Sequence, residues 1–291
     1  MIILNEKVFA EGCLRSGEIT GKPFNTLAVL AKYYYHCLGY RKKKIVEALT
    51  QFFSQNYPPY KSNKTSWDES IEKIARNAGK YPLYEIDGVW ITQHELDTIA
   101  TLEDDKLERI AFTFLCLAKF HVAKNPETDG WVNDDMNDIY EMARVACNRH
   151  QKNVYIGMLH DYGLLDFPKR NDNLSCRVTF MDDGDGVLRI TDFRELGYEY
   201  EKYRGEDYIR CCECGILMKN NRAKTKRYCN KCAGYQAVGT KTVICVDCGK
   251  EFEVDARSYK KIRCNECQSE MDSINARLRK QRQRERLNMS R

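Results

Sequence analysis

The sequence lacks the patterns that mark membrane and secreted proteins. No apolar run is long enough to span a bilayer, because the longest, IAFTFLCLAKFHVA, is interrupted by Lys119 and better suits a buried helix. The opening stretch, MIILNEKVFA, has no basic start followed by an apolar run and a small-residue cleavage site, so we expect no signal peptide. These absences predict a cytoplasmic protein that does not bind membranes.

Catalytic motifs are missing as well. The chain contains no Gly-x-Ser-x-Gly elbow, no His-Glu-x-x-His pair and no cysteine–histidine pair in a supporting context. The DDGDG segment at 182–186 lacks the terminal glutamate of a calcium loop and better suits a hairpin turn. GYQAVGTKT at 234–242 has one residue too many for a phosphate loop. We therefore expect a binding protein and not an enzyme.

Cysteine, in contrast, is abundant, with 14 in 291 residues. Eight of the cysteines form four Cys-x-x-Cys pairs, grouped two by two with 14 or 15 residues between the pairs. This spacing matches closed four-thiolate sites for tetrahedral zinc, so we predict two structural Zn²⁺ ions. Gly215 and Gly249 follow the first pair of each set and can take the left-handed conformation that this turn often needs. The predicted ligands are Cys211, Cys214, Cys229 and Cys232 for one ion and Cys245, Cys248, Cys264 and Cys267 for the other.

Alternatives to this interpretation stay open. A disulfide framework would use the same cysteines in an oxidising compartment. Each zinc module could be a treble clef, with its second ligand pair at a helix start, or a zinc ribbon with a turn at both ends. The segment KEFEVDARSYKKIR fits a short hairpin in both cases, and Cys212 is either an alternate ligand or a neighbour. The cysteines without a partner at metal spacing suit buried apolar positions; they are Cys13, Cys37, Cys116, Cys147 and Cys176.

Positive charge is concentrated at the C-terminal end of the chain. The net charge is +5, but residues 205–291 contain 20 Lys and Arg against 11 Asp and Glu. Four thiolates around each zinc would offset part of this excess. Much of the remainder lies in a proline-free segment at 271–291, which predicts a basic helical arm that attracts phosphates, or else a solvated tail. The arm residues expected to contact nucleic acid are Arg277, Arg279, Lys280, Arg282, Arg284 and Arg286.

Residues 1–106 have the pattern of a helical region. Helices are expected at 24–40, 41–55, 66–80 and 91–102. Breaks are expected at Pro58 and near Pro82. Thr92 followed by Glu95 is a capping-box pattern, which places one helix start. The fold class expected for the whole chain is mainly α with a small β content.

The order of elements in 107–193 resembles a winged helix-turn-helix domain. A long apolar helix is followed by GWVNDDMNDIYEMARVA, by a third helical segment in NRHQKNVYIGMLHDYGLLDF, and then by alternating strands. A Gly-Leu-Leu exit at 163–165 and a turn at 171–173 lead to LSCRVTF as the paired strand. The apolar spacing that carries the likeness on the third helix is Val154, Ile156, Leu159 and Tyr162.

This resemblance implies which residues would contact DNA, because the third helix of a winged helix lies in the major groove with the strand turn beside it. The groove-facing start would be Arg149, Gln151, Lys152 and Asn153, and the wing would contain Lys169, Arg170 and Asn173. The alternative is that the domain docks protein, because four carboxylates expected on the preceding helix would repel phosphate. They are Asp129, Asp134, Asp135 and Asp138.

The rest of the chain divides into a linker at 194–209, a first zinc module at 210–240, a second at 241–270 and the arm. The linker is rich in tyrosine, and we expect Tyr198, Tyr200, Tyr203 and Tyr208 to pack it against its neighbours rather than to stack on bases. Taken whole, the chain resembles winged-helix and double-zinc-ribbon proteins of phages and mobile elements. That resemblance implies a DNA-binding regulator or accessory factor in a bacterial cytoplasm, with DNA preferred over RNA.

Two other functions stay open at this point. One is a phage-encoded protein that binds and inhibits a nucleoprotein complex of the host. The other is a docking subunit of a replication or transcription assembly, in which the zinc modules act as rigid surfaces. Steep loss of affinity with rising salt would favour direct nucleic-acid binding over both.

Overall fold

The computed structural model describes residues 2–19, 22–168, 175–234, 240–255, 258 and 261–289, with the backbone alone for 255 and 280–289. Over these ranges the protein is mainly helical with small sheets, which confirms the expected fold class. The chain divides into two compact units: residues 1–211 and 215–226 form the larger, and residues 212–214 and 227–291 form the smaller. No helix in the described ranges has the length and apolar character needed to cross a membrane.

The larger unit begins with a helical bundle, whose helices lie within the part of the chain predicted to be helical. Its helices are α1 (Glu6–Ser16), α2 (Pro23–His36), α3 (Lys42–Asn56), α4 (Pro59–Ser62) and α5 (Lys64–Asn77). The side chain of Asn5 caps α1, and Gly17, with a φ of 71°, ends it. Leu27, Ile45 and Phe53 are fully buried in the core of this bundle.

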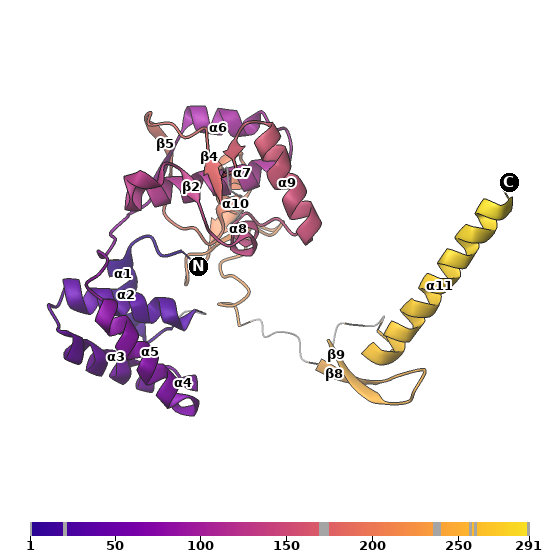
Figure 1. Ribbon diagram of the computed structural model, residues 1–291, viewed down its shortest axis with the longest axis horizontal. Coiled ribbons are helices and arrows are strands. Elements are labelled where there is room, and N and C mark those ends of the chain that lie inside the picture. Colours follow the sequence, from indigo (N-terminus) through magenta and orange to yellow (C-terminus); the bar gives the residue numbers. More distant parts are fainter. Residues whose placement is uncertain are drawn as a thin grey trace. The chain divides into compact units, whose positions relative to one another are not determined.

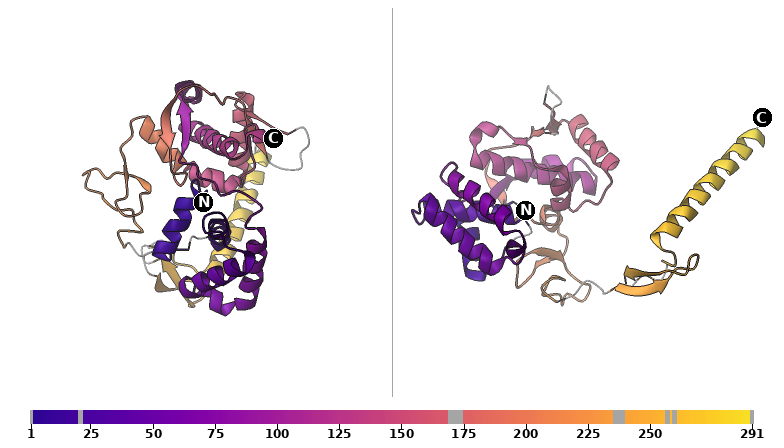
Figure 2. Two further views of the ribbon diagram at one scale, coloured as in Figure 1. Left: turned by 90° about the vertical axis from the view of Figure 1, so that its left-hand side faces the viewer. Right: turned by 60° about the horizontal axis from the view of Figure 1, so that its bottom comes forward.

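A second core in the larger unit surrounds one long helix. The helices here are α6 (Gln93–Ala100), α7 (Asp105–Lys124), the short η1 (Pro126–Thr128), α8 (Met136–Met142), α9 (Arg149–Asp161) and α10 (Leu196–Tyr203). Phe112, Phe114 and Leu115 of α7 are fully buried although they point in different directions. Figure 1 and Figure 2 show the other helices of this group gathered around α7. A helix that is apolar on most faces is the centre of a core.

Two small sheets lie against this core. β2 (Trp131–Val132), β3 (Leu165–Asp166) and β4 (Cys176–Val178) form an antiparallel sheet in the order β2-β4-β3. LSCRVTF therefore returns as a paired strand, as expected, whereas the turn predicted at 171–173 lies outside the described residues. β1 (Val89–Thr92) pairs with β5 (Gly186–Ile190).

The pairing of β5 contradicts the hairpin predicted at 182–186. β5 joins a strand that lies far away in the sequence and does not fold back on β4. A Cβ atom at Gly186 would lie only 2.6 Å from Cβ of Trp90. Glycine therefore permits this close approach of the two strands, which no local turn signal could indicate.

The capping box predicted at Thr92 is confirmed. The amide of Glu95 donates to the Thr92 hydroxyl, and the amide of Thr92 donates to the Glu95 carboxylate at 2.8 Å. The buried Glu95 also pairs with Lys119 of α7 at 2.8 Å. The start of α6 is therefore fixed both locally and by an ion pair to the central helix.

The stretch predicted to be a linker, 194–209, contains α10, which belongs to the core. Tyr200 is buried, and its hydroxyl donates to Glu108 of α7 at 2.9 Å. Tyr198 packs on Tyr208 with ring centroids 4.7 Å apart. These tyrosines contact neighbouring elements, as the packing interpretation expected.

The remaining elements belong to the cysteine-rich region. β6 (Tyr208–Arg210) pairs with β7 (Leu217–Lys219) in the larger unit. The smaller unit contains β8 (Thr240–Ile244), β9 (Glu251–Asp255) and α11 (Asn265–Met289). β9 lies near the start of the segment KEFEVDARSYKKIR, which was predicted to form a hairpin. Its partner strand is β8, which precedes Cys245. The hairpin therefore encloses the first ligand pair and does not lie between the two pairs as expected.

Replacement of Tyr200 with alanine should destabilise the larger unit by about 3–5 kcal/mol, because it removes a fully buried aromatic ring and one of the two donors to Glu108, the other being Arg204 at 2.8 Å. Denaturant unfolding followed by circular dichroism measures the change. Tyr203, which is 41% exposed on the same helix, provides the control. Its replacement with alanine should cost about 1 kcal/mol or less, and equal effects of the two substitutions would contradict the placement of α10 in the core.

Candidate metal centres

The first ligand pair of each set lies in a tight turn at the tip of a hairpin. Cys211 and Cys214 follow β6, and Cys245 and Cys248 follow β8. In both turns the amide of the following glycine donates to the carbonyl of the first cysteine at 2.9 Å. Gly215 and Gly249 each have a φ of 69°, in the left-handed region. The prediction that glycine supports these turns is therefore confirmed.

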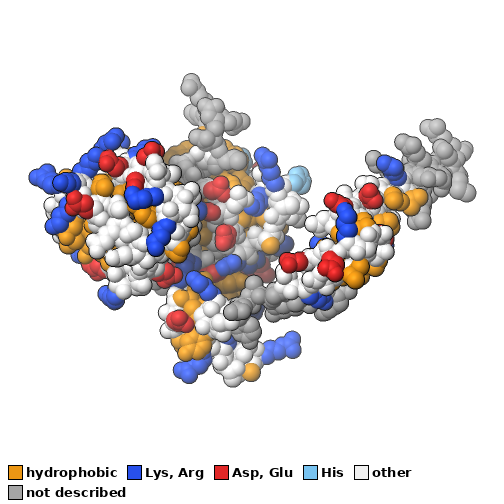
Figure 3. All heavy atoms as spheres, turned by 90° about the horizontal axis from the view of Figure 1, so that it is seen from below, with side chains coloured by type: hydrophobic (Ala, Val, Ile, Leu, Met, Phe, Trp, Pro, Cys, Tyr) orange, Lys and Arg blue, Asp and Glu red, His pale blue; other side chains and the backbone are white. Residues whose placement is uncertain are grey.

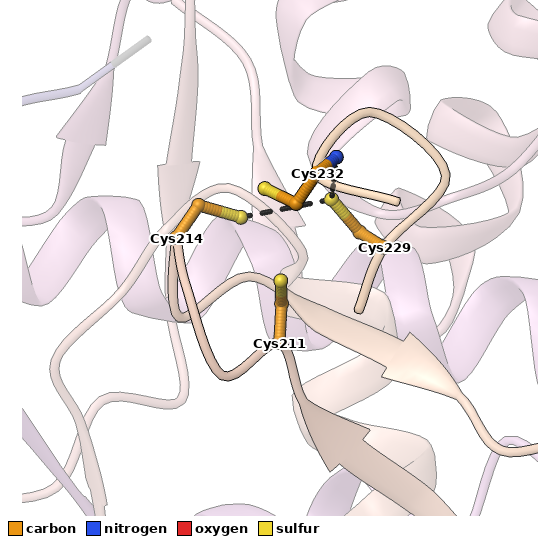
Figure 4. Close-up of side chains that lie close together, drawn as sticks. All are labelled: Cys211, Cys214, Cys229 and Cys232. Carbon is orange, nitrogen blue, oxygen red and sulfur yellow. Dashed lines mark hydrogen bonds between the residues drawn. The ribbon is translucent and has the colours of Figure 1, made fainter. Parts of the chain in front are cut away.

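The eight predicted ligands form two separate clusters. In each one the four sulfur atoms all lie within 4.8 Å of one another. Figure 4 shows the sulfurs of Cys211, Cys214, Cys229 and Cys232 converging on one point from two turns. All eight cysteines are free thiols, so the disulfide alternative is wrong for this structure.

The spacing of the sulfurs fits tetrahedral zinc. A Zn–S bond of about 2.3 Å places neighbouring sulfurs of a tetrahedron about 3.8 Å apart. The Sγ atoms of Cys214 and Cys229 are 3.7 Å apart, and those of Cys248 and Cys264 are 3.8 Å apart. Four thiolates are the donor set of structural zinc sites, so each cluster is suited to hold one Zn²⁺ with no position left for water.

The two centres share one backbone design. The amide of Cys212 donates to the carbonyl of Arg227 at 3.0 Å, and the amide of Val246 donates to the carbonyl of Ile262 at 3.1 Å. In each centre this bond joins the residue after the first ligand to the residue two before the third. Both second pairs also share the sequence Cys-Asn-x-Cys. The cysteine-rich region is therefore an internal repeat.

The second ligand pairs differ in their surroundings. Cys229 directly precedes the turn that contains Cys232, as in a zinc ribbon, and the amide of Cys232 donates to Sγ of Cys229 at 3.4 Å. Cys264 and Cys267 lie at the start of α11, the arrangement expected of a treble clef. The amide of Cys264 donates to Sγ of Cys245 at 3.4 Å. This bond, together with other backbone amides, lowers the pKa of the Cys245 thiol to about 6, whereas hydrogen bonds with neighbouring thiols raise the pKa of Cys267.

The hairpin that carries Cys211 is held within the larger unit. Arg210 of β6 pairs with the buried Glu199 of α10 and also donates to the carbonyl of Gly215 at 3.3 Å. Burial raises the pKa of the Glu199 carboxyl, and the Arg210 guanidinium opposes this shift. Arg210 therefore joins the turn that supplies two ligands to the helix that packs in the core.

The six remaining cysteines lie outside both clusters. Cys13, Cys116 and Cys176 are buried as expected, and burial raises the pKa of Cys176 to about 11. Cys147 is half-buried. Cys37 is exposed, so its predicted buried role is wrong. Cys212 is exposed and is not among the four cysteines that form the first centre, so it is a neighbour of the ligands and not one of them.

The residues predicted to contact DNA on α9 have different surroundings. Arg149 and Asn153 are exposed. Gln151 closes a capping box with Asn148, and Lys152 is half-buried with its ammonium donating to Asn137 at 2.7 Å. Their contacts with nucleic acid stay predictions. Lys169, Arg170 and Asn173 lie outside the described residues.

The apolar face of α9 is narrower than its spacing suggested. Ile156 and Leu159 are buried, but Val154 and Tyr162 are 44% and 56% exposed. On α11, Arg277 and Arg279 are exposed. Lys280, Arg282, Arg284 and Arg286 lie in the part of α11 for which only the backbone is described.

The four carboxylates predicted on the helix before the turn do not lie together on it. Only Asp138 is within α8, where it pairs with Lys22 at 2.7 Å. Asp135 caps that helix and accepts from the amide of Asn137. Asp134 contacts His121 at 2.5 Å, and Asp129, next to η1, pairs with Arg177 at 2.7 Å. Turns at Gly130 and before α8 separate these residues. The four carboxylates therefore contact different partners and do not form one acidic helix face.

Comparison of the chain with protein-family models, with curated proteins and with solved structures found no match.

Replacement of Cys245 and Cys248 with serine should remove one of two zinc ions, because the serine hydroxyls are poor ligands for this metal. It should also unfold the second zinc module, with β8, β9 and the start of α11, since metal binding and folding are linked at such sites. Elemental mass spectrometry and amide hydrogen exchange measure the two effects. Retention of two zinc ions per chain would contradict the assignment of this centre.

The matching substitution in the first centre, Cys211 and Cys214 to serine, should also remove one zinc ion. Because β6 and β7 pack within the larger unit, it should lower the melting temperature of that unit by about 4 °C or more. The Cys245 and Cys248 variant is the control and should leave that transition unchanged. If both variants shifted it equally, the first centre would not be anchored as described.

Proposed function

We propose that this protein is a non-enzymatic nucleic-acid-binding protein and that double-stranded DNA is the form it prefers. The observation that carries the proposal is the arrangement α7, β2, α8, α9, β3, β4 with the sheet order β2-β4-β3. This is the order of elements and strands expected of a winged helix domain. α9 would then be the helix that enters the major groove.

The partners of the carboxylates near α9 support this proposal. An acidic face would repel phosphate, which is the reason to assign the domain to protein docking. Asp138 and Asp129 instead form ion pairs with Lys22 and Arg177, and Asp134 contacts His121. Asp135 accepts from the backbone at the start of α8. Much of the repulsion expected from the sequence is therefore offset within the protein.

The zinc modules and α11 would add contacts that do not depend on sequence. The arm contributes seven Lys and Arg against one acidic residue between Ile274 and Arg291. A cationic helix attached to rigid zinc modules can follow the phosphate backbone, while base contacts come from α9. An origin in a phage or mobile element, and with it a bacterial cytoplasmic location, belongs to the same proposal and rests on the combination of these modules.

A docking role has a specific observation in its favour. The second zinc module exposes Ile244, Val246 and Ile262 at 63%, 60% and 45%. Val246 and Ile262 are joined by a backbone hydrogen bond. Figure 3 shows apolar side chains at the surface of the smaller unit next to charged ones. Clustered exposed apolar side chains favour contact with protein, so a docking subunit is the second candidate.

Replacement of Arg277, Arg279, Arg282 and Arg284 with alanine should weaken binding to duplex DNA at low salt without changing base preference. If each arginine neutralises one phosphate, the slope of log K against log salt should become shallower by about 3 to 4. Fluorescence anisotropy of the zinc-loaded protein, with duplex and single-stranded DNA and RNA at several salt concentrations, measures both quantities.

The run Arg41, Lys42, Lys43 and Lys44 provides a charge-matched control for this experiment. These residues begin α3 and are exposed, and Lys42 pairs with Glu72. Their replacement with alanine should leave the salt slope unchanged. If both variants changed the salt slope equally, the arm would contribute only nonspecific positive charge. If the wild type bound no nucleic acid, the result would favour protein docking over the proposed function.

A further inference from the structure

The exposed residues of α9 begin with polar side chains, and a glycine lies in the middle of the helix. Ile156 and Leu159 point into the core. Arg149, His150, Asn153, Val154 and His160 are exposed, and Gly157, which is half-buried, lies among them. We call this set the outer face of α9. Figure 1 shows α9 at the edge of the larger unit.

Gly157 has no explanation within the protein. It lies in the interior of a helix, where glycine is less stable than alanine. Its φ is not positive, and a Cβ atom placed there would meet nothing within 4 Å. In contrast, a Cβ at Gly197 of α10 would lie 2.0 Å from the carbonyl oxygen of Ala143. Packing therefore requires glycine at 197 but not at 157.

The residues around Gly157 are suited to contact bases. Asn153 lies one turn before it on the same face, and His160 lies one turn after it. An asparagine amide can donate to and accept from an adenine edge at once. The His160 ring is stacked on Phe167, with centroids 4.8 Å apart, so its position is supported. The nearest carboxylate on α9, Asp161, lies 3.6 Å from His160 at the end of the helix.

We propose that Gly157 is the point of closest approach between α9 and a DNA duplex, with Asn153 and His160 contacting base edges on either side of it. The inference rests on the proposed nucleic-acid function and places the contact one turn further along α9 than the sequence predicted. Gln151 and Lys152 have partners of their own, in the cap and at Asn137. The absence of a side chain at 157 lets the helix backbone come close to the groove floor.

The test compares Gly157→Ala with Gly12→Ala. Gly12 lies in α1 and, like Gly157, has nothing within 4 Å of an added Cβ. Both substitutions should raise the melting temperature slightly, by about 2 °C, because alanine favours a helix. Gly157→Ala should nevertheless weaken duplex binding at least about tenfold, whereas Gly12→Ala should leave it unchanged. Asn153→Ala should alter the preferred sequence in a selection from random duplexes.

The outcomes separate the inference from the function on which it rests. Wild-type affinity of Gly157→Ala for a duplex that the wild type binds would overturn the inference and leave the proposed function standing. A fall in melting temperature would also overturn it, because glycine would then have a reason within the fold. If the wild type bound no nucleic acid at any salt concentration, both would be overturned.

Discussion

The requirement that four thiolates meet around one metal ion determines the form of the C-terminal part of the chain. In the described part of the smaller unit, the buried apolar residues are Cys245, Val254 and Cys264, while Ile244, Val246 and Ile274 are exposed. Such a unit buries too little apolar surface to offset the entropy of ordering its chain. The interior of its second zinc module is the metal centre, and the turns, β8, β9 and the start of α11 present sulfur to it. Zinc therefore replaces a hydrophobic core in this unit.

The larger unit depends on apolar packing around α7 and on ion pairs that connect distant segments. The ion pair of Glu95 with Lys119 attaches α6 to α7, and that of Glu199 with Arg210 attaches the hairpin of β6 and β7 to α10. A hydrogen bond from Tyr200 to Glu108 attaches α10 to α7. This attachment gives the two zinc centres different roles. In the first centre Cys211 follows a strand of the larger unit, whereas the second centre lies at the start of a cationic helix.

The features that could be predicted from the sequence depend on residues close together in the chain. The Cys-x-x-Cys-Gly turns and the pairing of Thr92 with Glu95 follow from the chemistry of a few adjacent residues. The features that could not be predicted depend on distant partners. Tyr200 and Glu108 are 92 residues apart, and Lys22 and Asp138 are 116 apart. No periodicity or turn residue indicates such contacts, so α10 was expected to be a linker and the carboxylates near α9 were expected to form an exposed acidic face.

The central claim is that eight cysteines form two closed zinc centres around which the C-terminal region folds. X-ray absorption at the zinc edge, combined with the metal content per chain, tests it most directly. The account predicts two zinc ions per chain, each surrounded by four sulfur atoms at about 2.3 Å. Nitrogen or oxygen in the first coordination shell, or fewer than two zinc ions in the folded protein, would contradict it.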